Sequence, residues 1–183
     1  MTREPGPARR LFFALWPDQA IRRTLEKTCR KAVRSCGGRP VPPENYHITL
    51  AFLGNQPGAL FDDIVVAASA ISLQPMALEL DRFGYWPKPR VFWLGPSKHP
   101  ESLVKLAAQL RAKMELLGLQ PEHRPLKPHI SLCRKVAATP NADLPRPVRW
   151  SVENFVLVES VTAESGAQYQ VVKRFSQGSS HEP

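Results

Sequence analysis

One short pattern of residues occurs twice in this chain of 183 residues. The first copy spans residues 43–50 and reads PENYHITL, and the second spans residues 125–132 and reads PLKPHISL. Each copy has a proline-containing lead-in, followed by histidine, isoleucine, a hydroxyl residue and leucine. The copies lie nearly half the chain apart, which favours two similar lobes within one fold.

Alternation along a β-strand gives the pattern a geometric meaning. Residues i and i+2 of a strand project from the same face. His47 therefore shares a face with Thr49, and His129 shares a face with Ser131. The isoleucine and leucine of each copy point the other way, into an apolar layer. If the two lobes face each other, the cleft between them carries two imidazoles and two hydroxyls.

Two imidazoles in one cleft suit proton transfer on both sides of a phosphorus atom. Histidine has an unperturbed pKa of about 6.5, so one ring can take the proton of the attacking oxygen while the other protonates the leaving oxygen. The hydroxyls can hydrogen-bond the non-bridging oxygens, where charge builds up. This chemistry requires neither a metal nor a cofactor, and neither motif has a neighbouring carboxylate on its strand face. We expect no metal and no cofactor.

A structural role is the alternative for each histidine taken alone. A single histidine at the start of a strand is more often a hydrogen-bonded structural residue than a catalyst, but the second copy favours a shared function. His99 and His123 lack the pattern and are expected at the surface.

Apolar runs, helical periodicity and turn residues predict an α+β fold with a mostly antiparallel sheet. Strands are expected at 11–16, 47–53, 76–82, 91–95 and 129–133, with a closing hairpin of 150–159 and 168–175 around a loop that holds Gly166. Helices are expected from Pro17-Asp18 to Gly37-Gly38, over 57–70 and over 100–117, and residues 83–90 are expected to form a turn.

Composition narrows the class of protein. Hydrophobic residues make up 43% of the chain, which excludes whole-chain disorder, and the chain has no apolar run of about 18 residues that would span a membrane. The net charge of +9 favours an anionic partner such as nucleic acid. Basic residues between Arg22 and Arg34 on the first helix are typical of a solvated face, and we expect part of them to contact the anionic partner.

The cysteines and the chain ends bear on location and domain limits. Cys29, Cys36 and Cys133 form no Cys-x-x-Cys pair and are expected to be reduced thiols. The first residues lack a signal-peptide pattern, so we expect a cytoplasmic protein. We expect disordered tails at 1–9 and 176–183 and a single bilobal domain at 10–175.

Several segments resemble the two-histidine (2H) phosphoesterase superfamily, and more specifically the bacterial RNA 2′,3′-cyclic phosphodiesterases, historically called 2′-5′ RNA ligases. These segments are RLFFAL at 10–15, NYHITLAFLG at 45–54, HISLCR at 129–134, FVLVES at 155–160 and YQVV at 169–172. The resemblance runs in order from about residue 10 to 175. Ser131 stands where the family usually has threonine, and it keeps the hydroxyl.

The resemblance implies a fold and an activity. The fold would be bilobal, with two mostly antiparallel sheets facing across a central cleft, helices on the outside and a pseudo-two-fold relation between the lobes. The activity would be metal-independent hydrolysis of a 2′,3′-cyclic phosphate RNA end to a 2′-phosphate, with reversible 2′-5′ RNA ligation without ATP as its counterpart.

The resemblance also implies residue roles. His47 would donate a proton to the departing 3′ oxygen, and His129 would accept a proton from water. Thr49, Ser131 and Arg134 would bind the phosphate, although an ordinary exposed arginine is the alternative for Arg134. Base stacking is a further candidate role for Phe12, Phe13 and Tyr46, against core packing.

Other functions remain open at this point. The expected partner is RNA with a 2′,3′-cyclic phosphate end, with tRNA fragments as one candidate. We expect the protein to be a monomer and to have no membrane partner. A 2H phosphodiesterase that acts on small cyclic nucleotides or 2′-5′-linked oligonucleotides is one alternative. A non-catalytic RNA-binding module is another, and the two intact motifs argue against it.

Overall fold

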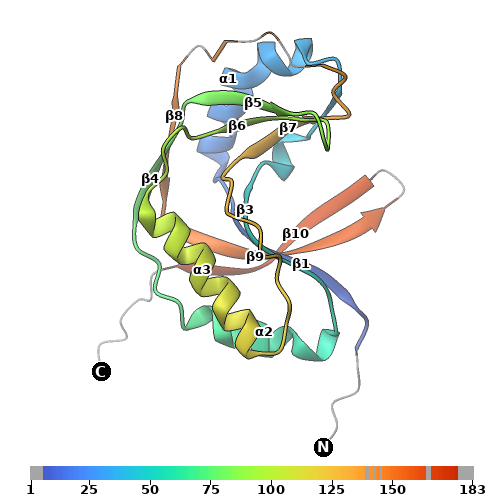
Figure 1. The fold of residues 1–183 in the computed structure, drawn as a ribbon, viewed down its shortest axis with the longest axis vertical. Helices are drawn as coiled ribbons and strands as arrows, with labels where there is room; N and C mark the ends of the chain where they lie inside the picture. Colours follow the sequence, from blue (N-terminus) through green and yellow to red (C-terminus); the bar gives the residue numbers. More distant parts are fainter. Residues whose placement is uncertain (1–5, 139–140, 142, 145, 164–165, 177–183) are drawn as a thin grey trace, which may run out of the picture.

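The computed structural model describes residues 6–138, 141, 143–144, 146–163 and 166–176 (Figure 1). Along the chain the elements are β1 (Arg9–Leu15), α1 (Gln19–Ser35), β2 (Arg39–Pro40), the 3-10 helix η1 (Pro43–Asn45), β3 (Ile48–Gln56), the 3-10 helix η2 (Gly58–Leu60), α2 (Phe61–Ser69), β4 (Met76–Leu80), β5 (Arg82–Trp86), β6 (Val91–Gly95), α3 (Glu101–Leu116), β7 (Ile130–Arg134), β8 (Val148–Val152), β9 (Asn154–Ala163) and β10 (Gly166–Ser176).

Two four-stranded sheets form the two lobes. One has the strand order β10-β9-β1-β3 and the other β2-β7-β6-β5, and β4 pairs with β8 in a separate ladder. All strand pairs among the described residues are antiparallel. Helix α1 packs beside β7 in one lobe, whereas α3 packs against β3 in the other (Figure 1). The expected bilobal α+β architecture is confirmed.

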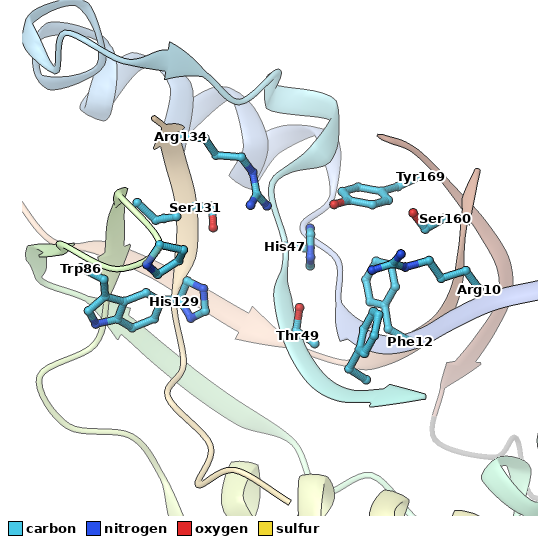
Figure 2. Close-up of a pocket in the computed structure, with 13 residues that line it drawn as sticks. Arg10, Phe12, His47, Thr49, Trp86, His129, Ser131, Arg134, Ser160 and Tyr169 are labelled. Atoms are coloured by element: carbon cyan, nitrogen blue, oxygen red, sulfur yellow. The ribbon is translucent and has the colours of Figure 1, made fainter. Parts of the chain in front are cut away.

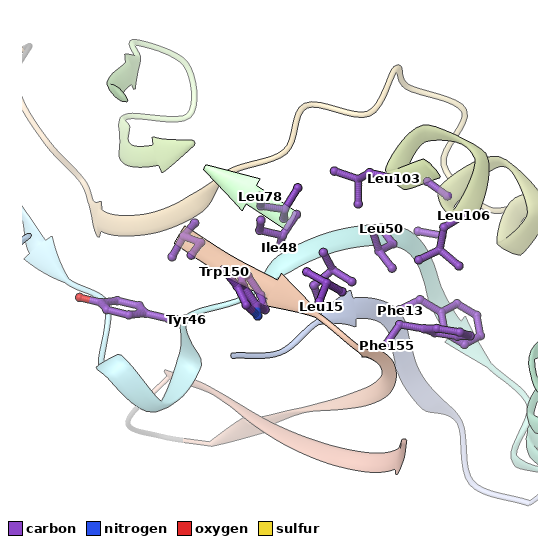
Figure 3. Close-up of a cluster of buried hydrophobic side chains, with 14 of the residues drawn as sticks. Phe13, Leu15, Tyr46, Ile48, Leu50, Leu78, Leu103, Leu106, Trp150 and Phe155 are labelled. Carbon is purple, nitrogen blue, oxygen red and sulfur yellow. The ribbon is translucent and has the colours of Figure 1, made fainter. Parts of the chain in front are cut away.

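Strand β1 is apolar and buried from Leu11 to Leu15 because both of its faces are covered there. Leu11, Phe13 and Leu15 belong to the main core, which Figure 3 shows between the strands and α3. Phe12, Ala14 and Trp16 alternate with them and join a second apolar cluster with residues of β9. The second cluster forms the part of the cleft floor that lies in this lobe.

Both motif strands carry a β-bulge at the same place, the leucine of the motif. The residues on either side of Leu50 pair with consecutive residues of β1, and those on either side of Leu132 pair with consecutive residues of β6. A bulge turns the following side chains onto the opposite face of the strand. This explains why Phe52 and Arg134 lie on the cleft side. The sequence repeat is therefore also a repeat of backbone geometry.

Helix α1 begins and ends where its sequence predicts. The Asp18 carboxylate accepts a hydrogen bond from the Ile21 amide at 2.8 Å, which is a normal N-cap. The helix ends at Ser35, and Gly37 follows with a φ of +62°, a conformation that favours glycine.

The structure corrects two parts of the strand prediction. Residues 83–86, expected within a turn, belong to β5, where Gly84 leaves room for the Trp93 ring that a Cβ would overlap. The segment expected as one strand at 150–159 is divided into β8 and β9, and β8 pairs with β4 instead of with the last hairpin. A partner far apart in sequence decided the second outcome, whereas β5 pairs with the neighbouring strand β6.

The cysteine prediction is wrong for two of the three residues. Cys36 and Cys133 form a disulfide, which joins the end of α1 to β7, and Cys29 is free and buried. The two bonded residues are separated by 97 positions, so no local spacing indicated their contact. Only packing of α1 against β7 brings them together.

The structure places two residues that were expected in the tails within strands. Arg9, expected in the tail, belongs to β1 and binds Glu159 in an ion pair of 2.6 Å. Ser176 closes β10. Residues 1–5 and 177–183 lie outside the described residues. Among the helices that the structure describes, none has the length and apolar character needed to cross a bilayer.

Candidate active site

The two motifs meet in one pocket of about 320 Å³ between the lobes (Figure 2). His47 lies immediately before β3 and His129 immediately before β7. Thr49, Ser131 and Arg134 line the same pocket. The structure thus brings together all the residues that the sequence predicts for proton transfer and phosphate binding.

The two histidines are held in the same way. Nδ1 of His47 lies 2.7 Å from the Asn45 carbonyl oxygen, and Nδ1 of His129 lies 2.7 Å from the Lys127 carbonyl oxygen. A carbonyl oxygen only accepts hydrogen bonds, so each Nδ1 carries the proton and donates it. Nε2 of each ring is then the nitrogen that exchanges a proton with a substrate.

Aromatic rings cover His47 on several sides. Trp16 stacks on it with ring centroids 5.3 Å apart, Phe12 lies at 5.1 Å, and Tyr169 meets it edge-on at 5.3 Å. This burial, together with the charges of His129 and Arg134 and against the opposing effect of the Asn45 carbonyl, lowers the pKa of His47 to about 4.

His129 has a similar but thinner aromatic cover. The Trp86 ring meets it edge-on with centroids 4.4 Å apart, and Trp93 lies at 6.4 Å. Burial lowers the pKa of His129 too, Arg134 contributes in the same direction, and the Lys127 carbonyl opposes them. Near pH 7 the free pocket therefore holds mostly neutral imidazoles beside the fixed positive charge of Arg134.

The phosphate-binding candidates lie on both sides of the pocket. Figure 2 shows Thr49 near His47, Ser131 near His129, and Arg134 extending from β7 toward the space between the histidines. An anion placed there would meet two hydroxyls and one guanidinium. These groups are suited to the non-bridging oxygens of a phosphodiester.

The structure corrects two of the three candidates for base stacking. Phe13 is fully buried and packs against Phe155, with ring centroids 6.2 Å apart. Tyr46 is 3% exposed and belongs to the main core. Each neighbours a pocket residue in sequence, so strand alternation and backbone direction turn it away from the cleft. Phe12 does line the pocket, where it packs on His47.

Sequence reasoning missed several pocket residues. Trp86 comes from a segment expected to be a turn, and Tyr169 comes from the last hairpin, which showed a family resemblance but no motif. Arg10 and Ser160 also line the pocket. Alternation along β1 places Arg10 on the same strand face as Phe12. Among the missed pocket residues, Arg10 is the one that a local sequence pattern indicated.

A metal centre finds no support in the donor set. No group of three or more histidine, cysteine, aspartate or glutamate side chains comes close enough to hold a metal ion within the described part of the chain.

Comparisons with known proteins give the pocket a family context. The family model for LigT like phosphoesterases matches residues 15–93, which include the first motif but not the second. Two curated relatives are named RNA 2′,3′-cyclic phosphodiesterase. The Escherichia coli protein is 34% identical over 91% of this chain and 96% of its own, and the Thermus thermophilus protein is 34% identical over 94% and 92%.

Solved structures agree with the sequence comparisons. E. coli LigT in its apo form has a TM-score of 0.83 at 32% identity, over 92% of this chain and 97% of that chain. The same E. coli protein complexed with 3′-AMP has a TM-score of 0.82 at 32% identity, over 93% and 98%. On sequence identity, coverage and fold, the chain belongs to the LigT-like phosphoesterase family.

Proposed function

We propose that this protein is an RNA 2′,3′-cyclic phosphodiesterase, which opens the cyclic phosphate at an RNA 3′ end to a 2′-phosphate. One observation carries the proposal. Two histidines, each anchored through Nδ1 to a carbonyl two residues earlier and followed by a hydroxyl residue, line one pocket. The names of the relatives support the same substrate class.

The proposed reaction is an in-line displacement at phosphorus. Nε2 of neutral His129 takes a proton from a water molecule, whose oxygen forms a new bond to phosphorus. The bond from phosphorus to the 3′ oxygen breaks, and protonated His47 gives its Nε2 proton to that oxygen. The products are a 3′-hydroxyl and a 2′-phosphate. Each ring ends with the opposite protonation state, and exchange with solvent restores both.

The phosphate itself supplies part of the electrostatics. A phosphodiester carries one negative charge, which favours protonation of an adjacent imidazole and so opposes the effect of burial on the pKa. The aromatic cover of His47 excludes water, which strengthens this attraction. Thr49, Ser131 and Arg134 would hold the non-bridging oxygens while the charge on them grows.

A product analysis tests the proposal. The protein is incubated in EDTA with an oligoribonucleotide that ends in a 2′,3′-cyclic phosphate, and the terminal phosphate is identified by phosphatase sensitivity and mass spectrometry. We expect a 2′-phosphate, and we expect His47→Ala and His129→Ala each to abolish turnover. His123→Ala is the matched control, because His123 is 75% exposed and lies outside the pocket. A 3′-phosphate product, loss of activity in EDTA, or full activity in either pocket variant would contradict the proposal.

Three finer expectations stay predictions: tRNA fragments as substrates, a monomeric state and a cytoplasmic location.

A further inference from the structure

We infer that the second-to-last nucleotide of the substrate, on the 5′ side of the nucleotide that carries the cyclic phosphate, lies in a second groove beside the catalytic pocket. The preferred substrate is therefore an oligonucleotide and not a mononucleotide. The inference rests on the proposed function and deepens it. The groove has a volume of about 420 Å³ and shares Thr49, Phe52, Trp86, Pro89 and His129 with the catalytic pocket. A chain whose end is bound at the histidines can therefore continue directly into it.

Three segments form the walls of the groove. They are β3, the chain segment 122–127 that leads to β7, and the β5–β6 turn. The Glu122 amide donates to the Phe52 carbonyl at 3.2 Å, which ties the second wall to the first. The hydrogen bond holds these two walls of the groove together. Helix α3 contributes Arg111 to the lining.

The third wall is fixed in place by hydrogen bonds across the lobe. Tyr85 Oη donates to the Val136 carbonyl at 3.0 Å, and Arg90 Nε donates to the same oxygen at 3.1 Å. Arg90 Nη2 also donates to the Lys135 carbonyl at 3.1 Å, and the Val136 amide donates to the Arg90 carbonyl at 3.1 Å. Lys88 lies on this turn between Trp86 and Arg90. The hydrogen bonds of the turn therefore hold the Lys88 backbone at the wall of the groove.

The charge of the groove fits a phosphate backbone. Its cationic side chains are Lys88, Arg111, Arg124 and Lys127, and its single carboxylate, Glu122, pairs with Arg124 at 2.8 Å. The Arg111 guanidinium donates to the Arg124 carbonyl at 2.9 Å. Lys88 and Lys127 are exposed and have no ion pair with any described residue, so these two ammonium groups are free to meet a phosphate.

Size and aromatic content indicate a single further nucleotide. A volume of about 420 Å³ is at the lower end of pockets that hold one small organic ligand. Phe52 and Trp86 lie where the groove joins the catalytic pocket, and aromatic faces with nearby cations are the usual combination for single-stranded nucleic acid. We therefore expect the benefit of chain length to appear between one nucleotide and two, and to level off soon after.

Two other basic surfaces compete for the same role. The opposite end of the cleft is lined by Lys135, Arg39 and Tyr169. The outward face of α1 carries Lys27 and Lys31 beside a shallow hollow. The α1 face provides a control variant with the same loss of two positive charges, and the opposite end of the cleft provides one with the loss of a single positive charge.

The experiment compares substrates that share one terminal nucleotide. Cytidine 2′,3′-cyclic phosphate, and di- and tetranucleotides that end in it, are assayed with the full chain and with Lys88→Ala/Lys127→Ala. The double variant keeps the Lys127 carbonyl that holds His129. We expect kcat/KM for the two oligonucleotides to fall by about tenfold, as for two exposed ion pairs, and kcat/KM for the mononucleotide to change less than twofold.

Salt dependence gives a second measurement on the same variants. Each lost contact to a phosphate of a single strand should lower the slope of log kcat/KM against log salt by about 0.7, hence by about 0.7 for the dinucleotide, which has one internal phosphodiester, and by at most about 1.4 for the tetranucleotide. Lys27→Ala/Lys31→Ala and Lys135→Gln should leave the ratio of oligonucleotide to mononucleotide kcat/KM unchanged.

The outcomes separate this inference from the proposed function. The groove assignment would be overturned by equal kcat/KM for one, two and four nucleotides. It would also be overturned if Lys135→Gln lost the preference for longer substrates and Lys88→Ala/Lys127→Ala kept it. Either result would leave the catalytic proposal intact. Failure of every cyclic phosphate to react would instead remove the proposed function.

Discussion

The pH dependence of kcat/KM follows from the burial of the two histidines. The free enzyme reacts only when one imidazole is protonated and the other is neutral. Burial lowers the pKa of His47 to about 4, and it lowers the pKa of His129 from its usual 6.5. Above both values the pocket lacks an acid, and below both it lacks a base. The profile should therefore be bell-shaped, with its maximum on the acidic side of neutrality.

The magnitude follows from the pKa of His47 and from the usual 6.5, below which the pKa of His129 lies. With the upper limb at or below pH 6.5, a tenfold loss per pH unit makes kcat/KM at pH 8 at least about 30-fold lower than its maximum. At pH 7, a pKa of about 4 leaves a proton on His47 in only about one molecule in a thousand. The bound phosphodiester favours the protonated ring, so both limbs of kcat should lie at higher pH than those of kcat/KM.

The assay uses initial rates on an oligonucleotide with a 2′,3′-cyclic phosphate, from pH 3.5 to 9 at constant ionic strength. NMR titration of the His47 ring protons measures its pKa directly. In Trp16→Ala, water should reach the ring that Trp16 now covers, and the pKa of His47 should rise toward 6.5. A kcat/KM maximum at pH 7 or above, or a His47 pKa near 6.5 in the unmodified protein, would refute the reasoning.

Three further outcomes are expected. With a cyclic substrate whose 3′ oxygen is replaced by sulfur, a thiolate leaves without protonation, so His47→Ala should regain most of its turnover and His129→Ala should not; rescue of the second variant alone would reverse the roles. Ser131→Ala should lower kcat/KM by about tenfold, as for one hydrogen bond to a charged group, and Ser131→Thr should keep it within about threefold. Phe13→Ala should lower the free energy of unfolding by about 3–5 kcal/mol in denaturant titrations, with KM unchanged; a raised KM at full stability would restore a role in binding.

The sequence predicted the parts of the site that are local. The spacing His-x-Thr/Ser within each copy was enough to place a ring and a hydroxyl on one face, and Asp18 marked the start of α1 at the correct residue. These features depend on neighbours within a few positions. Repetition of the pattern supplied the one long-range inference, that the two copies share a cleft.

The rest depended on contacts between distant segments. Trp86 reaches His129 only because β5 pairs with β6 and the turn is bound to Val136, 51 residues after Tyr85. Arg134 points into the pocket because of the bulge at Leu132, which is visible only in the register with β6. No pattern in a single sequence specifies a bulge or a partner at that distance, so Trp86 became recognisable only in the fold, and Arg134 was predicted only through the family resemblance.

The two motifs are alike in sequence, yet the lobes around them make the histidines chemically unequal. Three rings cover His47, and its pKa falls far, to about 4; His129 has the thinner cover of Trp86 and Trp93, and its pKa is lowered less. The group with the lower pKa is the stronger acid once protonated, and the group with the higher pKa is the stronger base. A leaving alkoxide needs the strongest available acid, and water needs the strongest available base. By intrinsic acid and base strength the difference in burial favours His47 as the donor, but the single proton of the free enzyme resides mainly on His129. The assigned roles therefore require the bound phosphodiester to shift that proton to His47, and the rescue of His47→Ala by the sulfur substrate measures whether His47 is the donor.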